Sequence, residues 1–238
     1  MAIKKDIYCL MVTDRIDWAR TSVANFLKQE YVNKKLLIFN NNLTENVCLS
    51  SQPGVVEYMI SKGGRTLGQL RNISLDYVPM GSYWFTWDDD DERHPKLLGS
   101  LMDAAIKNHS KYVLFKNRLN FNCHTNSLWR SSDSRGLKHF LAYKDNQFQY
   151  LNKNTLEDLP ANDLLSNTNK SAILLDNNPT WYVRFTHGDN TSPFVNVRQS
   201  TAVLNSGPYT ESRASEQDFL YIQSFVKNYS RVCPPRYQ

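Results

Sequence analysis

Four consecutive carboxylates, Asp88 to Asp91, directly follow the bulky run Tyr83–Trp87 in this 238-residue chain. A short, uniformly bulky run bounded by Gly81 and Pro95 is typical of a buried strand. Adjacent carboxylates repel one another unless a cation lies among them, and Mg²⁺ and Mn²⁺ prefer hard oxygen ligands. Ligands of open α/β sheets bind beyond the carboxyl ends of the strands. The run therefore predicts a divalent-metal site for a phosphate-bearing substrate, with a solvated acidic turn as the alternative.

The spacing within the run suggests which carboxylates act together. Asp88 and Asp90 are separated by one residue, and in an extended chain such a pair points to the same side. One or two carboxylates suffice for such a metal, because water and phosphates complete its ligands. We take Asp88 with Asp90 as the pair. Asp89 and Asp91 would then hydrogen-bond a ribose or support the metal-binding residues without touching the metal. The register remains open by one residue, since Asp89 with Asp91 has the same spacing.

His187 is a second candidate ligand. It follows the strand-like run WYVRFT and precedes Gly188. A neutral imidazole suits manganese, and a metal held by one or two carboxylates has room for it. A packed or surface histidine is the alternative interpretation.

Two further side chains have types suited to transfer chemistry. A general base must lie near the reacting carbon without being bound to the metal. Asp158, in the pair Glu157-Asp158, is a candidate, but composition alone does not separate it from Asp133, Asp145 or Asp163. An acid at a helix N-terminus also needs no such role. Arg71, in the stretch LGQLRN, carries a guanidinium that suits a diphosphate, with an ordinary surface arginine as the alternative.

Several well-defined motifs are absent from the sequence. It contains no Walker P-loop, no G-x-G-x-x-G, no G-x-S-x-G and no HExxH. Interpretations as an ATPase, a dinucleotide oxidoreductase, an α/β-hydrolase or a zincin therefore lose support.

Strands and helices alternate through the first 110 residues. Strands are expected at 6–13, 36–39, 55–60 and 83–87. A first helix is expected to begin with Asp14 or Asp17 as its cap, a second to span 67–77, and a third to begin at His94-Pro95. This order predicts a mainly parallel sheet with helices on its faces. The second half is less regular, with strands expected at 112–121, 128–129, 140–143, 172–175 and 181–186 and helices at 156–165 and 216–226.

Composition indicates a soluble globular protein, with 41% hydrophobic and 21% charged residues. No apolar run approaches the roughly 20 residues that a membrane span needs, and the first residues lack a secretory signal. We therefore expect a cytoplasmic protein without a membrane span. The net charge of +5 is dispersed, which attracts anionic substrates but does not indicate nucleic-acid binding.

The four cysteines are widely scattered. Cys9, Cys48, Cys123 and Cys233 form no CxxC pair and have no histidine at zinc-finger spacing. We therefore expect reduced thiols rather than disulfides or structural zinc.

Taken in order, four stretches resemble family-2 glycosyltransferases of the GT-A fold. They are a first strand ending in Thr13-Asp14-Arg15, LGQLRN before a helix and Gly81-Ser82-Tyr83, WDDDDERHPKLL, and Glu157-Asp158 followed by RFTHGDNTS. Each motif is loose, but their order is specific, and together they span residues 6–192.

The resemblance implies an α/β, Rossmann-like GT-A fold. A mainly parallel central sheet would carry helices on both faces, beside a smaller, irregular acceptor-side half. The transferase domain would span 1–192, with a nucleotide-binding half over about 1–110 and an acceptor-side half over about 111–192. Residues 193–238 would form an extension packed on the same domain.

The resemblance also implies a role for each candidate residue. Thr13, Arg15 and Asn40 or Asn41 would contact the nucleotide base, and Arg71 would contact the nucleotide. Asp88 and Asp90 would bind the ribose and the diphosphate-bound metal. Asp158 would be the catalytic base, and His187 would complete the metal site. Family members commonly carry an acid at the end of the second strand, where this chain has Asn40-Asn41-Asn42. Asparagine can still donate and accept hydrogen bonds there.

The implied activity is a metal-dependent, inverting transfer of a sugar from a nucleoside diphosphate donor, foremost a UDP-sugar, to a hydroxyl of a carbohydrate or glycoconjugate. Mn²⁺ or Mg²⁺ would be the cofactor. Aromatic residues of the second half would stack on sugars or fill the core. A sugar-phosphate nucleotidyltransferase is an alternative, but it would need a Gly-rich basic loop near the N-terminus. A non-catalytic carbohydrate-binding protein with a degenerate transferase fold is another.

Overall fold

The structure of the chain is a computed structural model. It describes residues 5–48, 50–115, 118–123, 127–131, 140–145, 148–155, 157–158, 172–175, 182–187 and 211–213, together with 216 and 220.

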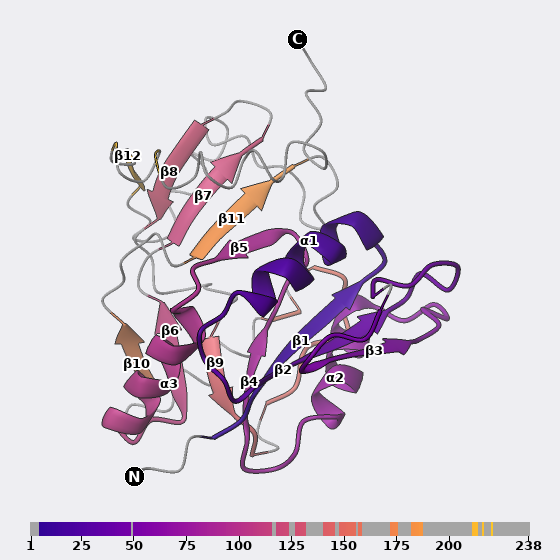
Figure 1. The fold of residues 1–238 in the computed structure, drawn as a ribbon, viewed down its shortest axis with the longest axis horizontal. Coiled ribbons are helices and arrows are strands. Elements are labelled where there is room, and N and C mark those ends of the chain that lie inside the picture. The colour runs from indigo at the N-terminus through magenta and orange to yellow at the C-terminus, as the bar shows by residue number, and fades with distance from the viewer. Residues whose placement is uncertain are drawn as a thin grey trace.

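Two β-sheets form the framework of the described part (Figure 1). The larger has the strand order β10-β6-β9-β4-β1-β2-β3, and the smaller has the order β12-β8-β7-β11-β5. The strands of the larger sheet are β1 Ile7–Thr13, β2 Lys34–Asn40, β3 Val55–Met59, β4 Tyr83–Thr86, β6 Tyr112–Phe115, β9 Phe140–Tyr143 and β10 Ala172–Leu175. Those of the smaller sheet are β5 Asp91–Arg93, β7 Arg118–Asn122, β8 Ser127–Ser131, β11 Tyr182–Thr186 and β12 Glu211–Arg213.

The parallel centre of the larger sheet determines where the candidate residues lie. β1 pairs in parallel with β2 and with β4, and Thr13 lies opposite Asn40. Leu10 of β1 lies opposite Thr86, the last residue of β4. Because these strands are parallel, their carboxyl ends share one edge of the sheet, and the acidic run begins at that edge.

Helices cover both faces of this sheet (Figure 1). Strand residues alternate between two faces, so Ile7, Cys9 and Met11 of β1 join the core cluster that contains α1 Ile16–Leu27 and α3 Leu97–Lys107. Tyr8 and Leu10 join the opposite cluster, which contains residues of α2 Leu67–Asp76. The predicted fold class, a mostly parallel α/β sheet with helices, is confirmed.

Three of the aromatic residues expected to stack on sugars or fill the core lie in the core of the described part. Phe140, Phe148 and Tyr150 are buried in the cluster around Trp84. Each has its ring centroid within 6.2 Å of the Trp84 centroid. The core interpretation therefore holds for these three residues.

Several predicted elements differ from the structure. The single strand expected over 112–121 is wrong, because β6 belongs to the larger sheet and β7 to the smaller one. Neither Asp14 nor Asp17 caps α1, whose N-cap residue Arg15 makes no side-chain cap bond. A strand-like composition does not reveal where a chain changes sheets. The helices expected at 156–165 and 216–226 fall mostly on residues outside the described part.

The acidic run continues into an unexpected strand. β5, which begins at Asp91, pairs antiparallel with β11 in the smaller sheet. The run therefore connects the two sheets instead of ending as an isolated turn.

The prediction that all cysteines are reduced is wrong for Cys123, which is disulfide-bonded. Cys9 and Cys48 are free. Spacing along the sequence does not show which cysteines approach in space, which is what a disulfide requires.

Within the described residues, no helix has both the length and the apolar character to cross a bilayer.

Candidate active site

Each carboxylate of the acidic run has a different set of partners. Asp88 is bound by Arg71, and Asp89 by Thr13 and Arg15. Asp90 lies against His187 and Arg15. Asp91 accepts hydrogen bonds from the smaller sheet. The repulsion within the run is offset by the guanidinium groups of Arg15, Arg71 and Arg93.

Asp89 is held by Thr13 and Arg15 at the end of β1. The Thr13 hydroxyl donates to Oδ2 of Asp89 at 2.5 Å and accepts the Arg15 backbone N–H at 3.0 Å. The guanidinium grips both carboxylate oxygens, with Nε donating to Oδ2 at 3.2 Å and Nη2 donating to Oδ1. Burial, together with the charge of Asp90, raises the pKa of Asp89 to about 6 against the opposing effect of Arg15.

Asp90 and His187 form a buried pair where the two sheets meet. Oδ2 of Asp90 lies 3.1 Å from Nε2 of His187 and accepts from Nη2 of Arg15 at 2.8 Å. Trp18 of α1 stacks on the imidazole, with ring centroids 4.3 Å apart and planes inclined by 20°. Burial would raise the pKa of Asp90, but the hydrogen bonds and charges of His187 and Arg15 outweigh it and lower the pKa. Asp90 is therefore ionised at neutral pH.

Arg71 connects the acidic run to the Glu157-Asp158 pair. Its Nη2 donates to Oδ1 of Asp88 at 2.9 Å, and its Nη1 lies 3.2 Å from Oε1 of Glu157. The guanidinium lies 5.5 Å from the ring centroid of Tyr150. Glu157 and Asp158 are both buried. The candidate base is thus placed next in the chain to a carboxylate that Arg71 already holds.

Asp91 fastens the run to β11. Its Oδ2 accepts a hydrogen bond from the Tyr182 hydroxyl, and its Oδ1 accepts the Phe185 N–H at 3.3 Å. Burial, followed by the charge of Asp90, raises the pKa of Asp91 to about 7. These contacts direct Asp91 toward the smaller sheet rather than toward Arg15.

Arg93 is a site-shaping residue that the sequence reasoning missed. It is fully buried, and its Nη1 donates to the backbone oxygens of Asp88 and Asp91 at 3.1 and 3.0 Å. Its guanidinium lies 4.2 Å from the ring centroid of Trp87. A buried arginine at the end of an acidic run closes the turn that aims the four carboxylates. The available signal was an arginine within three residues of Asp90.

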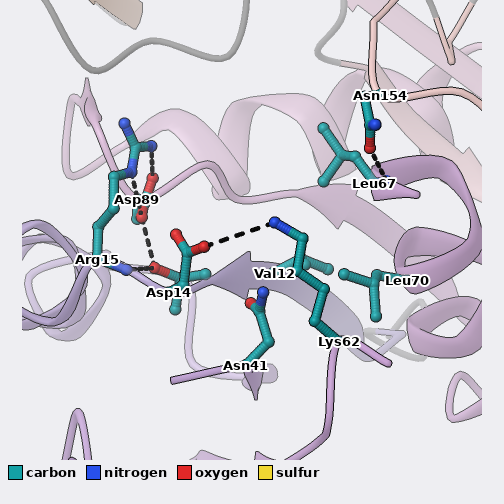
Figure 2. A pocket seen from close by; sticks show the side chains of 10 residues that line it. Val12, Asp14, Arg15, Asn41, Lys62, Leu67, Leu70, Asp89 and Asn154 are labelled. Atoms are coloured by element: carbon teal, nitrogen blue, oxygen red, sulfur yellow. Dashed lines mark hydrogen bonds and ion pairs between the residues drawn. The ribbon is translucent and has the colours of Figure 1, made fainter. Parts of the chain in front are cut away.

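A pocket of about 190 Å³ opens beside Asp89 at the ends of β1 and β2. Figure 2 shows Arg15, Asn41 and Lys62 around it, with Lys62 directed at Asp14 at 3.9 Å. The sequence reasoning did not select Lys62, which follows the third strand, although it did select Asn41.

The two predicted asparagines have different surroundings. The side-chain nitrogen of Asn40 donates to Glu57 and to the Glu45 carbonyl, both at 2.8 Å, and the residue is fully buried. Asn41 lines the pocket, and its buried Oδ1 accepts no hydrogen bond from the described residues. Asn41 is therefore the asparagine that is placed to contact a ligand.

The described residues contain no group of three or more histidine, cysteine, aspartate or glutamate side chains that could hold a metal ion. Asp90 and His187 form a pair. Two ligands about 2.1 Å from one metal and at right angles lie about 3 Å apart, which matches the 3.1 Å between these two groups. Their chemistry and spacing fit two positions of a Mn²⁺ or Mg²⁺ ion. Asp88, the third predicted ligand, is paired with Arg71 at 2.9 Å, just as Asp90 is paired with Arg15 at 2.8 Å.

The architecture is a GT-A-like glycosyltransferase fold. Solved structures of S. aureus TarS 1–349 resemble it. The complex with UDP-GlcNAc matches at 13% sequence identity and a TM-score of 0.55, and the match covers 95% of this chain and 73% of that one. The complex with UDP matches at 12% identity and a TM-score of 0.53, and the match covers 95% of this chain and 72% of that one. A third structure of TarS 1–349 matches at 13% identity and 0.52, covering 76% of this chain and 60% of that one. No family profile matches the sequence, and neither does any curated protein sequence. At these identities the likeness shows the fold alone.

Proposed function

We propose that this protein is a glycosyltransferase that moves a sugar from a nucleoside diphosphate donor, foremost a UDP-sugar, to an acceptor hydroxyl. The observation that carries the proposal is the gathering of Arg15, Arg71, the Asp90–His187 pair and Asp158 around one sheet edge, beside a pocket. The planar guanidinium groups of Arg15 and Arg71 each offer several N–H donors, which suits the diphosphate of such a donor. The TarS structures with UDP-GlcNAc and UDP support this donor class.

The base and ribose of the donor would lie in the pocket. Thr13 and Arg15 form its wall at the end of β1, and Asn41 faces them from the end of β2. An amide both donates and accepts, which suits the edge of a pyrimidine. Asp89 would keep Thr13 and Arg15 in place and contact the ribose, and Asn40 would support the loop, since its Oδ1 accepts the Asn42 N–H at 2.9 Å.

Asp90 and His187 would hold Mn²⁺ or Mg²⁺, and water and diphosphate oxygens would complete the ligands. When bound, the ion would neutralise charge on the departing diphosphate. Asp88 and Arg71, held together at 2.9 Å, would face the diphosphate from the other side.

Asp158 would accept the proton of the attacking hydroxyl. The hydroxyl oxygen forms a bond to the anomeric carbon while the bond from that carbon to the diphosphate breaks, and the configuration inverts. Glu157 already pairs with Arg71, which supports the assignment of the base to its neighbour.

Release of UDP from UDP-sugars, measured with and without Mn²⁺, tests the proposal. A transferase releases UDP when an acceptor or water is present. A carbohydrate-binding protein releases none, and a nucleotidyltransferase instead forms pyrophosphate from a nucleoside triphosphate and a sugar phosphate. A thermal-shift panel of nucleoside diphosphates and their sugars identifies the donor.

Asn41→Ala is expected to weaken UDP binding about tenfold, because one or two hydrogen bonds to the base would be lost. Stability should change little, since Oδ1 of Asn41 has no partner to lose among the described residues. Calorimetric titration with UDP measures the affinity. Asn42→Ala is the control, because Asn42 is the next residue and its side-chain oxygen accepts hydrogen bonds from Thr44 within the same turn. Equal affinities for wild type and Asn41→Ala would remove Asn41 from the donor site.

Asp91→Asn is expected to become more stable relative to wild type as pH rises from 5 to 8. Burial raises the pKa of Asp91 from 3.8 to about 7, so the folded protein holds a proton that the unfolded chain releases, and wild-type stability falls through this range. Because the amide cannot ionise, the free energy of unfolding of Asp91→Asn should exceed that of wild type by roughly 1–3 kcal/mol at pH 8. Thermal melting in EDTA at several pH values measures it. Asp17→Asn, at an exposed position, should show no such trend, and a pH-independent difference for Asp91→Asn would contradict the shift.

A further inference from the structure

The Arg15 guanidinium contacts both groups of the proposed metal site. Its Nη2 is 2.8 Å from Oδ2 of Asp90, and its Nη1 is 3.5 Å from Nε2 of His187. The two atoms that Arg15 faces, Oδ2 of Asp90 and Nε2 of His187, are themselves 3.1 Å apart. The atoms that would bind an ion therefore both face a cation that belongs to the chain.

Arg15 occupies one side of the Asp90–His187 pair. An ion about 2.1 Å from both atoms on that side would fall within contact distance of the guanidinium nitrogens. The ion and the guanidinium are also both positively charged, and the site is buried, so their repulsion is only weakly screened. Binding of a metal on this side therefore requires release of the bond from Arg15 to Asp90.

Arg15 also has a place to go. Its side chain is 24% exposed, and it borders the pocket next to Asp89. Asp89 holds the guanidinium through Nε as well as Nη2, so a small rotation that frees Asp90 keeps one anchor. A diphosphate entering beside the pocket offers the freed N–H groups new acceptors.

We propose that Arg15 is a resident counter-cation that occupies the metal position until the donor diphosphate draws it away. This inference rests on the proposed function. Metal alone must displace the guanidinium, whereas metal with the diphosphate exchanges one set of partners for another. The two ligands therefore bind cooperatively, and Arg15 supplies the coupling.

Mn²⁺ binding tests the proposal without an activity assay. Electron paramagnetic resonance of unbound Mn²⁺ gives the affinity of wild type and Arg15→Gln, each with and without UDP. We expect Arg15→Gln to bind Mn²⁺ alone roughly tenfold more tightly, and UDP to enhance Mn²⁺ binding less in the variant than in wild type. His187→Ala in the Arg15→Gln background should abolish the gain, which locates the ion at the pair.

Arg71→Gln is the matched control, because it removes the same charge from beside Asp88 without touching Asp90 or His187. It should tighten Mn²⁺ binding by no more than about threefold. Equal tightening in both variants, or none in Arg15→Gln, would overturn the proposal. Thermal melting checks the fold, and Arg15→Lys, which keeps the charge but loses the fork, should lie between wild type and Arg15→Gln. If wild type fails to bind UDP, the proposed function fails, while the Mn²⁺ affinities without UDP still test the displacement.

Discussion

Asp158→Asn should reduce sugar transfer by about 10²- to 10⁴-fold, because an amide cannot accept the acceptor proton. The substitution preserves size, and Asp158 is buried next to a carboxylate that Arg71 holds. Donor binding should persist, since none of the proposed base and diphosphate contacts comes from Asp158. The expected signature is a loss of kcat with little change in the affinity for UDP.

Initial rates of UDP release with a transferable acceptor, together with a UDP titration, separate these two quantities. Asp145→Asn is the control. This acid pairs with Lys111 at 2.9 Å beyond the end of β9, which runs antiparallel to β4 and so ends at the opposite edge of the sheet. A fully active Asp158→Asn enzyme would rule out its role as the base.

Gly68→Ala should destabilise the protein by about 3 kcal/mol or more, a larger cost than most substitutions impose. A Cβ at this position would lie 1.7 Å from the Leu151 carbonyl oxygen and 3.2 Å from Cβ of Glu157. The Gly68 N–H also donates to the Lys153 carbonyl at 3.0 Å. The first turn of α2 thus lies directly against the segment that carries Glu157 and Asp158.

The same substitution should lower activity beyond the loss of folded protein, because separating α2 from this segment pulls Arg71 away from Glu157. Thermal melting and the rate per folded molecule measure the two effects. Gly99→Ala in α3 is the matched control. Its Cβ would meet nothing within 4 Å, and replacing a helical glycine with alanine gains about 0.5–1 kcal/mol. A Gly68→Ala protein as stable as wild type would show that the segment shifts freely.

The first half of the fold was predictable because its signals are local. Apolar runs separated by turn residues mark β1, β2 and β4, and the amphipathic stripes mark the helices between them. Thr66 and Gln69 form a capping box that begins α2 close to the expected position. Parallel pairing then places the ends of β1 and β4 together, so the sequence alone indicated where the acidic run lies.

The second half depended on long-range pairing. Residues 112–121 have the composition of one strand, yet the chain leaves the larger sheet after Phe115 and joins the smaller one at Arg118. The polar stretch Lys116-Asn117-Arg118 interrupts the apolar pattern, but it does not show that the strands on its two sides belong to different sheets. Sheet membership is decided by partners such as β11, which lies about 60 residues further along the chain.

Local sequence signals were enough to locate the strand that carries Asp88 to Asp91, the sheet edge at which they lie, and the order of the arginine, acid and histidine motifs around them. What each carboxylate contacts depends on the folded arrangement of the two sheets. The spacing rule for Asp88 and Asp90 assumes an extended chain, whereas the run turns from β4 into β5. Asp88 is directed at Arg71, Asp89 and Asp90 share Arg15, and Asp91 contacts β11. Arg93 supplies part of the charge that offsets their repulsion from within the same stretch of sequence, whereas the rest comes from Arg15 and Arg71, which the folded sheet brings beside the run.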